Sequence, residues 1–360
     1  MNAMNTNAAL SQSWKGSRID WRSAGLHAFT EVELAAIDAG LSHYKQLEPK
    51  DFRQMTTSDL PLDALQPALE RANHNIQNGV GFMMFRGLDV ERYTRDELAL
   101  VFYSIGLHLG LPIIQSHQGE LLGHVIDLSD IEKSPRGYHT GGHMGMHTDS
   151  CDIVGLMCLN RALSGGDSRI ANVRAIVEQM EQERPDLAAV LRQGFYFRRM
   201  EQDAELGDGV VCSPQRIPIY ARNGDTFSAY FLGGYIERAV KAGDAVLTPI
   251  EQEALGMLNR LAESPEFYLD MSFTSGDIQF LNNRLQLHGR THYEDGKTMM
   301  ERRHLIRMWL KMPSWPAMPA SQVLHTEGDR AKWGARRTPL MDMPSRYLAE
   351  KARIREAMAA

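Results

Sequence analysis

The chain has 360 residues, of which 43% are hydrophobic and 23% charged, and its formal net charge is −6. This is an ordinary globular composition, and the acidic balance argues against a general nucleic-acid binder, which would carry a basic surface. The three cysteines include no C-x-x-C pair, so we expect reduced thiols in a cytoplasmic protein. Residues 1–16 lack the apolar run of a signal peptide, and no window is apolar enough for a membrane span.

The first part of the chain alternates helical and strand patterns. Residues 1–25 have no apolar pattern and are expected to form a flexible arm. Apolar residues recur at helical spacing in three segments, which predict helices from Thr30 to about residue 41, over 62–76 and over 96–109. Two short apolar runs predict buried strands over 81–87 and 122–128.

The rest of the chain holds more strands and one helical insert. Residues 164–168 predict a turn, Asn172 can cap a helix, and Thr248-Pro-Ile-Glu251 is a capping box that opens a helix to about residue 263. Asn223-Gly224 between two apolar runs predicts a hairpin. The expected strands are 153–159, 216–221, 226–231, 268–274, 277–281 and 304–310, and the expected terminal helix is 345–358.

Many short strands, with helices gathered early and in one long insert, indicate an α+β fold. We predict a double-stranded β-helix core of the jelly-roll or cupin-like class, flanked by helices. The sequence shows no internal repeat and no clear domain boundary. Residues 26–360 are therefore expected to form a single domain with helical insertions and a C-terminal helix.

The most informative tripeptide is His147-Thr148-Asp149, which follows an irregular segment, residues 134–145, with four glycines and a proline. Residues two apart in a strand point to the same face, so H-x-D aims an imidazole and a carboxylate at one point. With one more histidine they would form the 2-His-1-carboxylate triad of non-haem Fe(II) oxygenases. The tripeptide alone is weak evidence, because most such triplets are surface loops or hydrogen-bonded pairs.

The third ligand should be a histidine on a late strand or at its end. His288 is the candidate, within the stretch from Gly276 to Arg290. His292, four residues later, is a rival, and a hydrogen-bonded turn histidine is the plain alternative. All three interpretations remain open at this point.

Two arginines near the C-terminal end of the expected core suggest an anionic ligand. Arg303 and Arg307 would share one face of a strand with Leu305 and Trp309. Arginine suits bidentate binding of carboxylates, and a buried arginine needs a partner. A dicarboxylate cosubstrate would supply it, whereas the alternative, a surface strand with scattered charge, conflicts with the apolar residues beside the arginines.

Four motifs in order carry a family resemblance: H-T-D, G-G-D-S, G-D-I-x-x-x-N-N-R-x-x-x-H and R-R-H-L-I-R. Together they resemble the Fe(II)/2-oxoglutarate dioxygenases of the taurine dioxygenase and clavaminate synthase type. The similarity runs from about Gly81 to Trp309. The resemblance implies that His147, Asp149 and His288 hold iron.

The same resemblance implies a binding site for 2-oxoglutarate. Arg303 would bind the distal carboxylate of the cosubstrate, and Ser168, where members often have threonine, would keep a hydroxyl donor to it. Arg307 matches a position that in some members contacts an anionic substrate or the other end of the cosubstrate. The irregular residues 134–145 fall where members carry a mobile substrate lid.

The implied activity is hydroxylation of an unactivated C–H bond of a small, possibly anionic metabolite, with O₂ as oxidant and release of succinate and CO₂. Desaturation, epoxidation or cyclisation would use the same residues, whereas Asp149 occupies the coordination site that a halogenase needs for halide. A non-redox cupin-like metal hydrolase is the second alternative, but it leaves Arg303 and Arg307 without a role. A barrel that binds a ligand without catalysis is the third. We expect no nucleic-acid or membrane partner, and the sequence is compatible with a homo-oligomer.

Overall fold

The computed structural model describes residues 12–133, 135–224, 226–338 and 342–359. Its centre is a seven-stranded sheet in the order β1–β2–β12–β6–β15–β3, in which β4 also pairs with β15. Only the β1–β2 pair is parallel. The strands of this sheet are β1 (Leu26–Ala28), β2 (Phe82–Arg86), β3 (Leu111–Ile113), β4 (Leu122–Val125), β6 (Ile153–Asn160), β12 (Ile278–Asn282) and β15 (His304–Lys311).

A second, four-stranded sheet has the order β11–β8–β13–β5. Side chains from both sheets join one apolar cluster, which includes Val154 and Leu305 of the first sheet and Ile170 and Met271 of the second. Two sheets that enclose a common core confirm the predicted double-stranded β-helix with flanking helices. The strands of the second sheet are β5 (Met144–His147), β8 (Ser168–Asn172), β11 (Tyr268–Met271) and β13 (Gln286–Arg290), and a separate short pair joins β7 (Ser164–Gly165) to β14 (Tyr293–Glu294).

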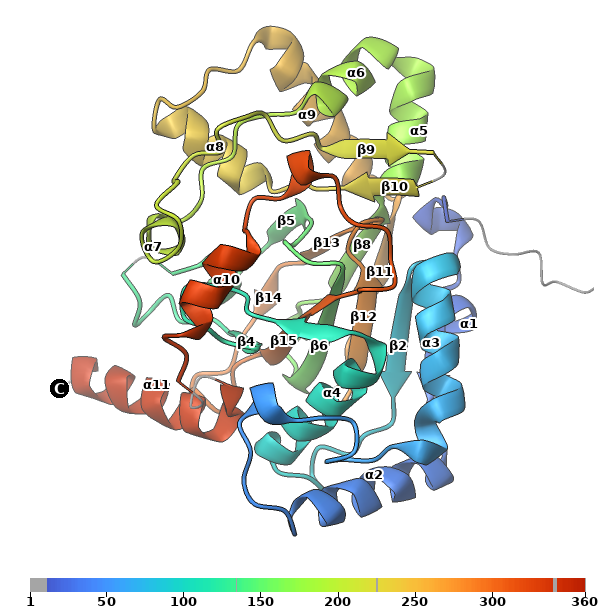
Figure 1. Ribbon diagram of the computed structural model, residues 1–360, viewed down its shortest axis with the longest axis vertical. Helices are drawn as coiled ribbons and strands as arrows, with labels where there is room; N and C mark the ends of the chain where they lie inside the picture. The colour runs from blue at the N-terminus through green and yellow to red at the C-terminus, as the bar shows by residue number, and fades with distance from the viewer. Residues whose placement is uncertain (1–11, 134, 225, 339–341, 360) are drawn as a thin grey trace, which may run out of the picture.

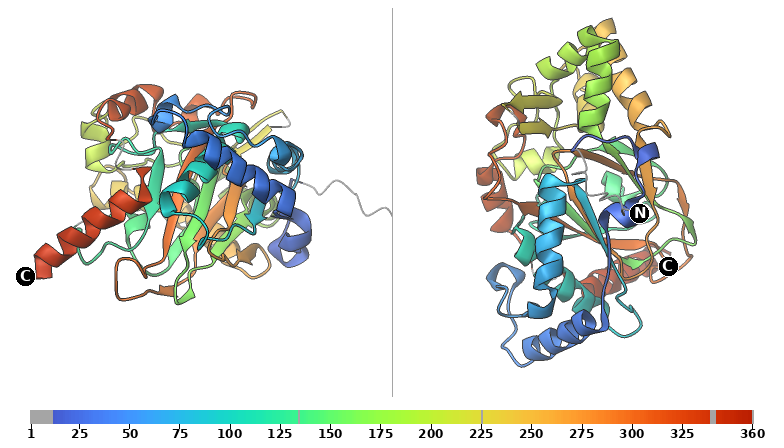
Figure 2. Two further views of the ribbon diagram at one scale, coloured as in Figure 1. Left: turned by 90° about the horizontal axis from the view of Figure 1, so that it is seen from below. Right: turned by 90° about the vertical axis from the view of Figure 1, so that its right-hand side faces the viewer.

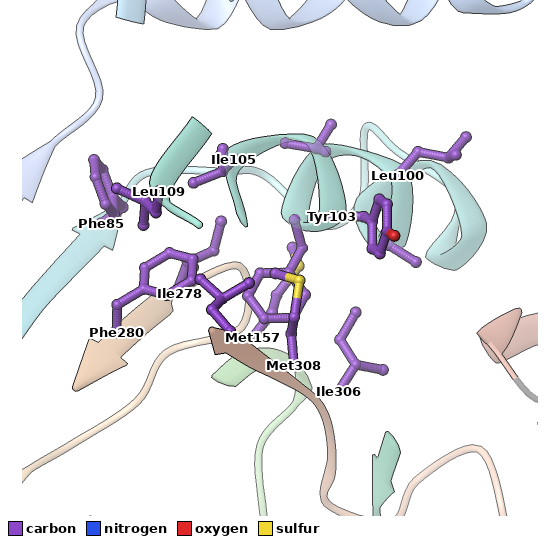
Figure 3. Close-up of a cluster of buried hydrophobic side chains, with 14 of the residues drawn as sticks. Phe85, Leu100, Tyr103, Ile105, Leu109, Met157, Ile278, Phe280, Ile306 and Met308 are labelled. Carbon is purple, nitrogen blue, oxygen red and sulfur yellow. The ribbon is translucent and has the colours of Figure 1, made fainter. Parts of the chain in front are cut away.

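Helices from the first third of the chain cover the outer face of the large sheet (Figures 1 and 2). They are α2 (Glu31–Tyr44), α3 (Gln66–Asn78) and α4 (Arg95–Leu109). Figure 3 shows α4 lying over the sheet, with Ile105 and Leu109 above Phe280 and Met308. A capping box at Thr94 fixes the start of α4. These helices agree with the predicted segments.

The long insert between β8 and β11 forms a helical layer at one end of the barrel (Figure 1). The predicted caps are present, since Asn172 accepts from the backbone of Ala175 and Thr248 forms a capping box with Glu251. The expected hairpin is also present, although Asp225 lies outside the described residues. The elements are α5 (Val173–Glu183), α6 (Pro185–Gln193), α7 (Glu201–Glu205), β9 (Tyr220–Asn223), β10 (Thr226–Ala229), α8 (Gly233–Lys241) and α9 (Pro249–Ala262).

The C-terminal segment packs back onto the barrel before it ends in a helix that projects from the body (Figure 2). The helices are α10 (Glu327–Gly334) and α11 (Pro344–Ala359), and the second of these confirms the predicted terminal helix. The remaining short elements are η1 (Gly16–Arg18), α1 (Trp21–Gly25), η2 (Phe52–Gln54), η3 (Asp63–Leu65), η4 (Gly137–His139) and η5 (Ala320–Gln322). No helix among the described residues is both long and apolar enough to span a bilayer.

Three local predictions need correction. Residues 12–25 of the expected flexible arm form η1 and α1, and Trp14 and Trp21 are buried against the barrel; residues 1–11 lie outside the described residues. The predicted turn over 164–168 ends inside a strand, because Ser168 opens β8. The predicted loop over 134–145 contains η4 and the start of β5, whose pairing with β13 gives this glycine-rich segment its order. The division into arm and single domain stays a prediction.

Candidate active site

The pairing of β5 with β13 brings two distant histidines together. His147 and His288 are direct partners in the antiparallel register, and their ring centroids lie 4.3 Å apart. Gly289 allows this close approach, since a Cβ there would lie 2.6 Å from the carbonyl oxygen of Met144. Asp149 follows the end of β5, and its carboxylate oxygens lie 3.9 Å from His147 Nε2 and 3.7 Å from His288 Nε2.

Two of these residues, His147 and Asp149, have the protonation states that a metal ligand needs. His147 Nδ1 donates to the carbonyl oxygen of Gly145 at 2.9 Å, which leaves the Nε2 lone pair facing the other two residues. Burial, together with the neighbouring His288, lowers the pKa of His147 to about 4, so its ring is neutral near pH 7. Burial alone would raise the pKa of Asp149, but Arg307 and the two histidines outweigh it and hold that pKa well below its usual range.

The donor set fits the metal that the sequence implies. Two imidazoles and one carboxylate place their ligand atoms within 4.8 Å of one another. This is the donor composition of a facial-triad Fe(II) site. His292, the rival candidate, is exposed and does not belong to this group.

Asn283 holds the backbone of the H-x-D segment in place. Its Oδ1 accepts from Asp149 N at 2.8 Å, and its Nδ2 donates to the carbonyl oxygens of Asp149 and Cys151, each at 2.7 Å. Asn283 directly follows β12, so the first sheet orients a residue that the second sheet carries. The sequence motifs gave no indication of this role for Asn283.

Arg307 and Trp309 of β15 both donate to Asp149 Oδ2. The distances are 3.2 Å from Arg307 Nη1 and 2.8 Å from the indole nitrogen of Trp309. Arg307 Nε also donates to Gln115 Oε1 at 2.8 Å. The two β15 residues share a face as predicted, but the contacts to Asp149 and Gln115 depend on tertiary packing and were not foreseen.

A second group of basic residues lies beside the ligand set. The Arg303 guanidinium donates to the carbonyl oxygen of Gly166 at 2.9 Å and has no carboxylate within ion-pair distance among the described residues. Burial and the neighbouring Arg290 lower the pKa of Arg303 to about 10. Ser168 pairs with Arg290 across β8 and β13, and its hydroxyl donates to Gln279 Oε1 at 3.0 Å. Two buried guanidinium groups and a hydroxyl therefore lie close together, and neither guanidinium has a carboxylate within ion-pair distance among the described residues.

Arg290 was missed by the sequence analysis, although a signal was present. It lies two residues after His288, so it falls on the same face of β13 as the proposed ligand. Its own guanidinium donates to the carbonyl oxygens of Thr140 and Gly142. Arg290 thereby joins the cationic group to the segment that was predicted as a lid.

A cavity of about 710 Å³ opens in front of the ligand set. His147, Asp149 and Arg307 line its base. Residues 135–138 and 143–146 form one wall, and the start of α8 forms another, with Gly233 and Gly234 among the lining residues. The predicted lid therefore borders the cavity, although Ser134 lies outside the described residues. A space of this size suits a small metabolite.

Comparison with known proteins agrees with this geometry. The family model "Taurine catabolism dioxygenase TauD, TfdA family" matches residues 43–309. FR-33289 synthase from Streptomyces rubellomurinus is 27% identical over 281 residues, which are 76% of this chain and 81% of that protein. The taurine hydroxylase-like protein SAT17 from Stachybotrys chartarum is 27% identical over 313 residues, which are 82% of this chain and 77% of that protein.

Solved structures share the fold. An asparagine oxygenase, solved with Fe(II), 3-hydroxyasparagine and succinate, superposes with a TM-score of 0.64 at 15% identity over 83% of this chain and 98% of its own. The non-haem iron oxygenase OrfP, solved with Fe and alpha-ketoglutaric acid, gives a TM-score of 0.60 at 14% identity over 79% of this chain and 94% of its own. Because the family model spans more than half of the sequence, the chain belongs to the TauD/TfdA family and is an Fe(II)- and 2-oxoglutarate-dependent oxygenase.

Proposed function

We propose that this enzyme hydroxylates an unactivated C–H bond of a small polar metabolite. One oxygen atom of O₂ enters the product hydroxyl and the other enters succinate, which forms from 2-oxoglutarate with loss of CO₂. The observation that carries the proposal is the meeting of His147, Asp149 and His288 beside a cavity that His147 and Asp149 line. Iron bound at this site would enable O₂ to oxidise the C–H bond, and this oxidation would be coupled to decarboxylation of 2-oxoglutarate.

The residues proposed as iron ligands are His147, Asp149 and His288. The protonation states of His147 and Asp149 support the assignment, since no proton has to leave His147 Nε2 or the Asp149 carboxylate when a metal binds near pH 7. Trp309 and Arg307 orient the carboxylate through Oδ2. Hydrogen bonds of this kind typically fix the orientation of a metal ligand.

Arg303 and Ser168 are proposed to bind the distal carboxylate of 2-oxoglutarate. A buried guanidinium without a counter-charge is costly, and an incoming carboxylate would offset that cost. Arg290 lies next to both residues and adds a second positive charge. We assign Arg307 to the iron-side end of the site, where it holds Asp149 and lines the cavity.

The relatives support a small polar substrate. One relative is a taurine hydroxylase-like protein and another is a uridine-5'-phosphate dioxygenase. Of the structural relatives, one is an asparagine oxygenase and another, OrfP, was solved with (3S)-hydroxy-L-Arg. The lining of this cavity is of mixed polarity, with Arg136 and Asp203 beside Met146 and Phe231. Hydroxylation is the simplest outcome, while desaturation, epoxidation and cyclisation remain alternatives with the same cofactors.

The test is succinate formation from 2-oxoglutarate by the purified enzyme with Fe(II) under air, with and without a panel of small metabolites. We expect slow, substrate-independent succinate release in the wild type and its loss in His288→Ala. A variant of the rival histidine, His292→Ala, serves as the matched control and should keep this activity. A non-redox hydrolase would release no succinate and consume no O₂, and that result would overturn the proposal.

A further inference from the structure

A second cavity adjoins the active-site cavity. It measures about 360 Å³ and lies between the residues that follow Asp149 and the segment 312–325 that precedes α10, the helix in front of the barrel in Figure 1. Ser150 and His325 line both cavities. Since Ser150 directly follows Asp149, the second cavity begins one residue away from the proposed iron ligands.

Hydrogen bonds connect residues of the second cavity around Ser150, which also lines the first cavity. The hydroxyl groups of Ser150 and Tyr230 lie 2.5 Å apart. Arg330 of α10 donates to the carbonyl oxygen of Ser150 at 2.7 Å and to that of Ile114 at 2.5 Å. Its guanidinium also lies 5.8 Å from the ring centroid of Trp309, the residue that contacts Asp149. Arg330 thus links the second cavity to the iron site.

The charges around the second cavity do not balance. Arg284 is neutralised by Asp152 and Lys311 by Glu327, each at 2.6 Å. Arg330, which is only 8% exposed, donates to backbone carbonyls and has no carboxylate within ion-pair distance among the described residues. One buried positive charge is therefore left over, and an anion in the cavity would offset its desolvation cost.

Neutral polar groups in the same wall also lack partners. The indole nitrogen of Trp315 and Nδ1 of His325 are buried, and neither has a hydrogen-bond partner among the described residues. Buried polar atoms without hydrogen-bond partners are uncommon and point to a bound water or ligand. Much of the remaining wall is apolar, with Met312, Met318 and Leu324, so it suits a carbon chain that ends in an acceptor group.

We propose that the second cavity binds the distal oxyanion of an elongated substrate, whose acidic group accepts hydrogen bonds from Arg330 and Trp315. A phosphonate, phosphate, sulfonate or carboxylate has the required chemistry. The carbon chain would pass between Ser150 and His325, so that the carbon to be oxidised lies in the first cavity. The inference rests on the proposed function, because it assigns the reaction to that cavity.

The indole N–H signals of the tryptophans, observed by ¹⁵N NMR, report on each cavity separately. The chain has five tryptophans, and Trp315→Phe and Trp309→Phe assign the two signals that matter. Trp309 donates to Asp149 and reports on the first cavity, whereas Trp315 reports on the second. The protein is first saturated with Zn(II), a diamagnetic substitute for iron, and with 2-oxoglutarate. Absence of a Trp309 shift at this step would count against the proposed function alone.

Methylphosphonate and hexylphosphonate are then added as probes. We expect methylphosphonate to shift the Trp315 signal alone and hexylphosphonate to shift both signals, since its chain reaches the first cavity. A Trp315 signal that moves with neither probe overturns the proposal. If hexylphosphonate shifts the Trp315 signal and leaves the Trp309 signal unchanged, the second cavity binds a free anion. The proposal that it binds the distal group of a substrate is then wrong.

Variants separate a specific site from general electrostatic attraction. Arg330→Gln should weaken hexylphosphonate binding about tenfold or more, the usual effect of losing a charge-assisted hydrogen bond. Lys311→Gln is the matched control, because it removes the same charge from the same wall but from a residue paired with Glu327. Equal weakening in the two variants would contradict the proposal. Ala317→Trp, at an exposed lining position, should block binding without removing any of these contacts.

Discussion

His288 lies directly opposite His147 in the β5–β13 pair, and Asp149 completes the group from the end of β5. The three ligand atoms come from segments about 140 residues apart in the chain, so the site exists only once the second sheet has formed. The strand register between β5 and β13 therefore determines whether the proposed iron ligands meet. A shift by one residue would turn His288 to the other face of the sheet.

Alanine at His147, Asp149 or His288 is expected to abolish turnover and to remove bound Fe(II). The reason is that a facial triad has only three protein ligands, and two cannot hold the metal against exchange with water. Iron content per chain and succinate release are the measurements. His292→Ala should retain iron, and loss of iron in that variant together with retention in His288→Ala would show that the third ligand is misassigned.

Arg303→Ala is expected to raise the apparent KM for 2-oxoglutarate sharply. Loss of a charge-assisted pair in a closed site costs about 2–5 kcal/mol, or about 30-fold and more in KM. Ser168→Ala removes one hydroxyl and should cost about 1 kcal/mol. Arg302→Ala is a useful control, since Arg302 is adjacent but already paired with Asp130 at 2.6 Å. An unchanged KM in Arg303→Ala would remove the main support for the cosubstrate site.

The sequence was most informative where the determining interactions are local. The capping box from Thr248 to Glu251 and the cap at Asn172 were predicted and are present, because both motifs involve residues three apart. The strand β8 was missed, since apolar and polar residues alternate only weakly in its short sequence. It forms through pairing with β11 and β13. Register between distant strands is not encoded in a local pattern.

The same division applies to the candidate site. His147 and Asp149 were identified by spacing, and His288 by its place late in the chain. The contacts of Trp309 and Asn283 with Asp149 were not predicted, because they join residues that are more than 130 positions apart in the chain. Sequence spacing finds side chains that share a face of one strand, but it does not show which residues from other strands contact them.

Glu132 is expected to make part of the stability dependent on pH. Burial alone would raise its pKa, but hydrogen bonds from His139 and Lys351 outweigh this effect and lower the pKa from 4.5 to about 2. A carboxylate whose pKa is lower in the folded protein than in the unfolded chain stabilises the fold when the pH is above the unfolded pKa. This contribution is therefore complete above about pH 4.5 and is lost as the pH falls to about 2.

Denaturant unfolding of Glu132→Gln against pH checks this expectation. The variant should be less stable than the wild type near neutral pH by about 1–2 kcal/mol, a value reduced for partial exposure, and the difference should vanish in strong acid. Glu356→Gln, an exposed substitution on α11, is the control. A difference that persists unchanged in strong acid would show that Glu132 acts through packing and not through its charge.

Arg307→Gln is expected to reduce substrate-independent succinate release together with iron affinity. Arg307 donates to Asp149 Oδ2 at 3.2 Å, and it is the chief neighbouring charge that lowers the pKa of that carboxyl. Glutamine keeps a donor but removes the charge, so the loss should be about 1.5–3 kcal/mol, or at least about tenfold. Trp309→Phe removes the other donor to the same oxygen and leaves the charge in place, so it should have a smaller effect of about 1 kcal/mol.

The alternative role for Arg307, binding of an acidic group on the substrate, predicts a different result. In that case substrate-independent decarboxylation and iron affinity would survive in Arg307→Gln, while productive turnover would collapse and the KM for substrate would rise. The contacts with Asp149 and Gln115 favour the first outcome, because Nη1 and Nε of Arg307 already donate to these two protein oxygens. Parallel assays of succinate release and iron content in Arg307→Gln and Trp309→Phe therefore decide between a residue that orients the metal ligand and one that recognises the substrate.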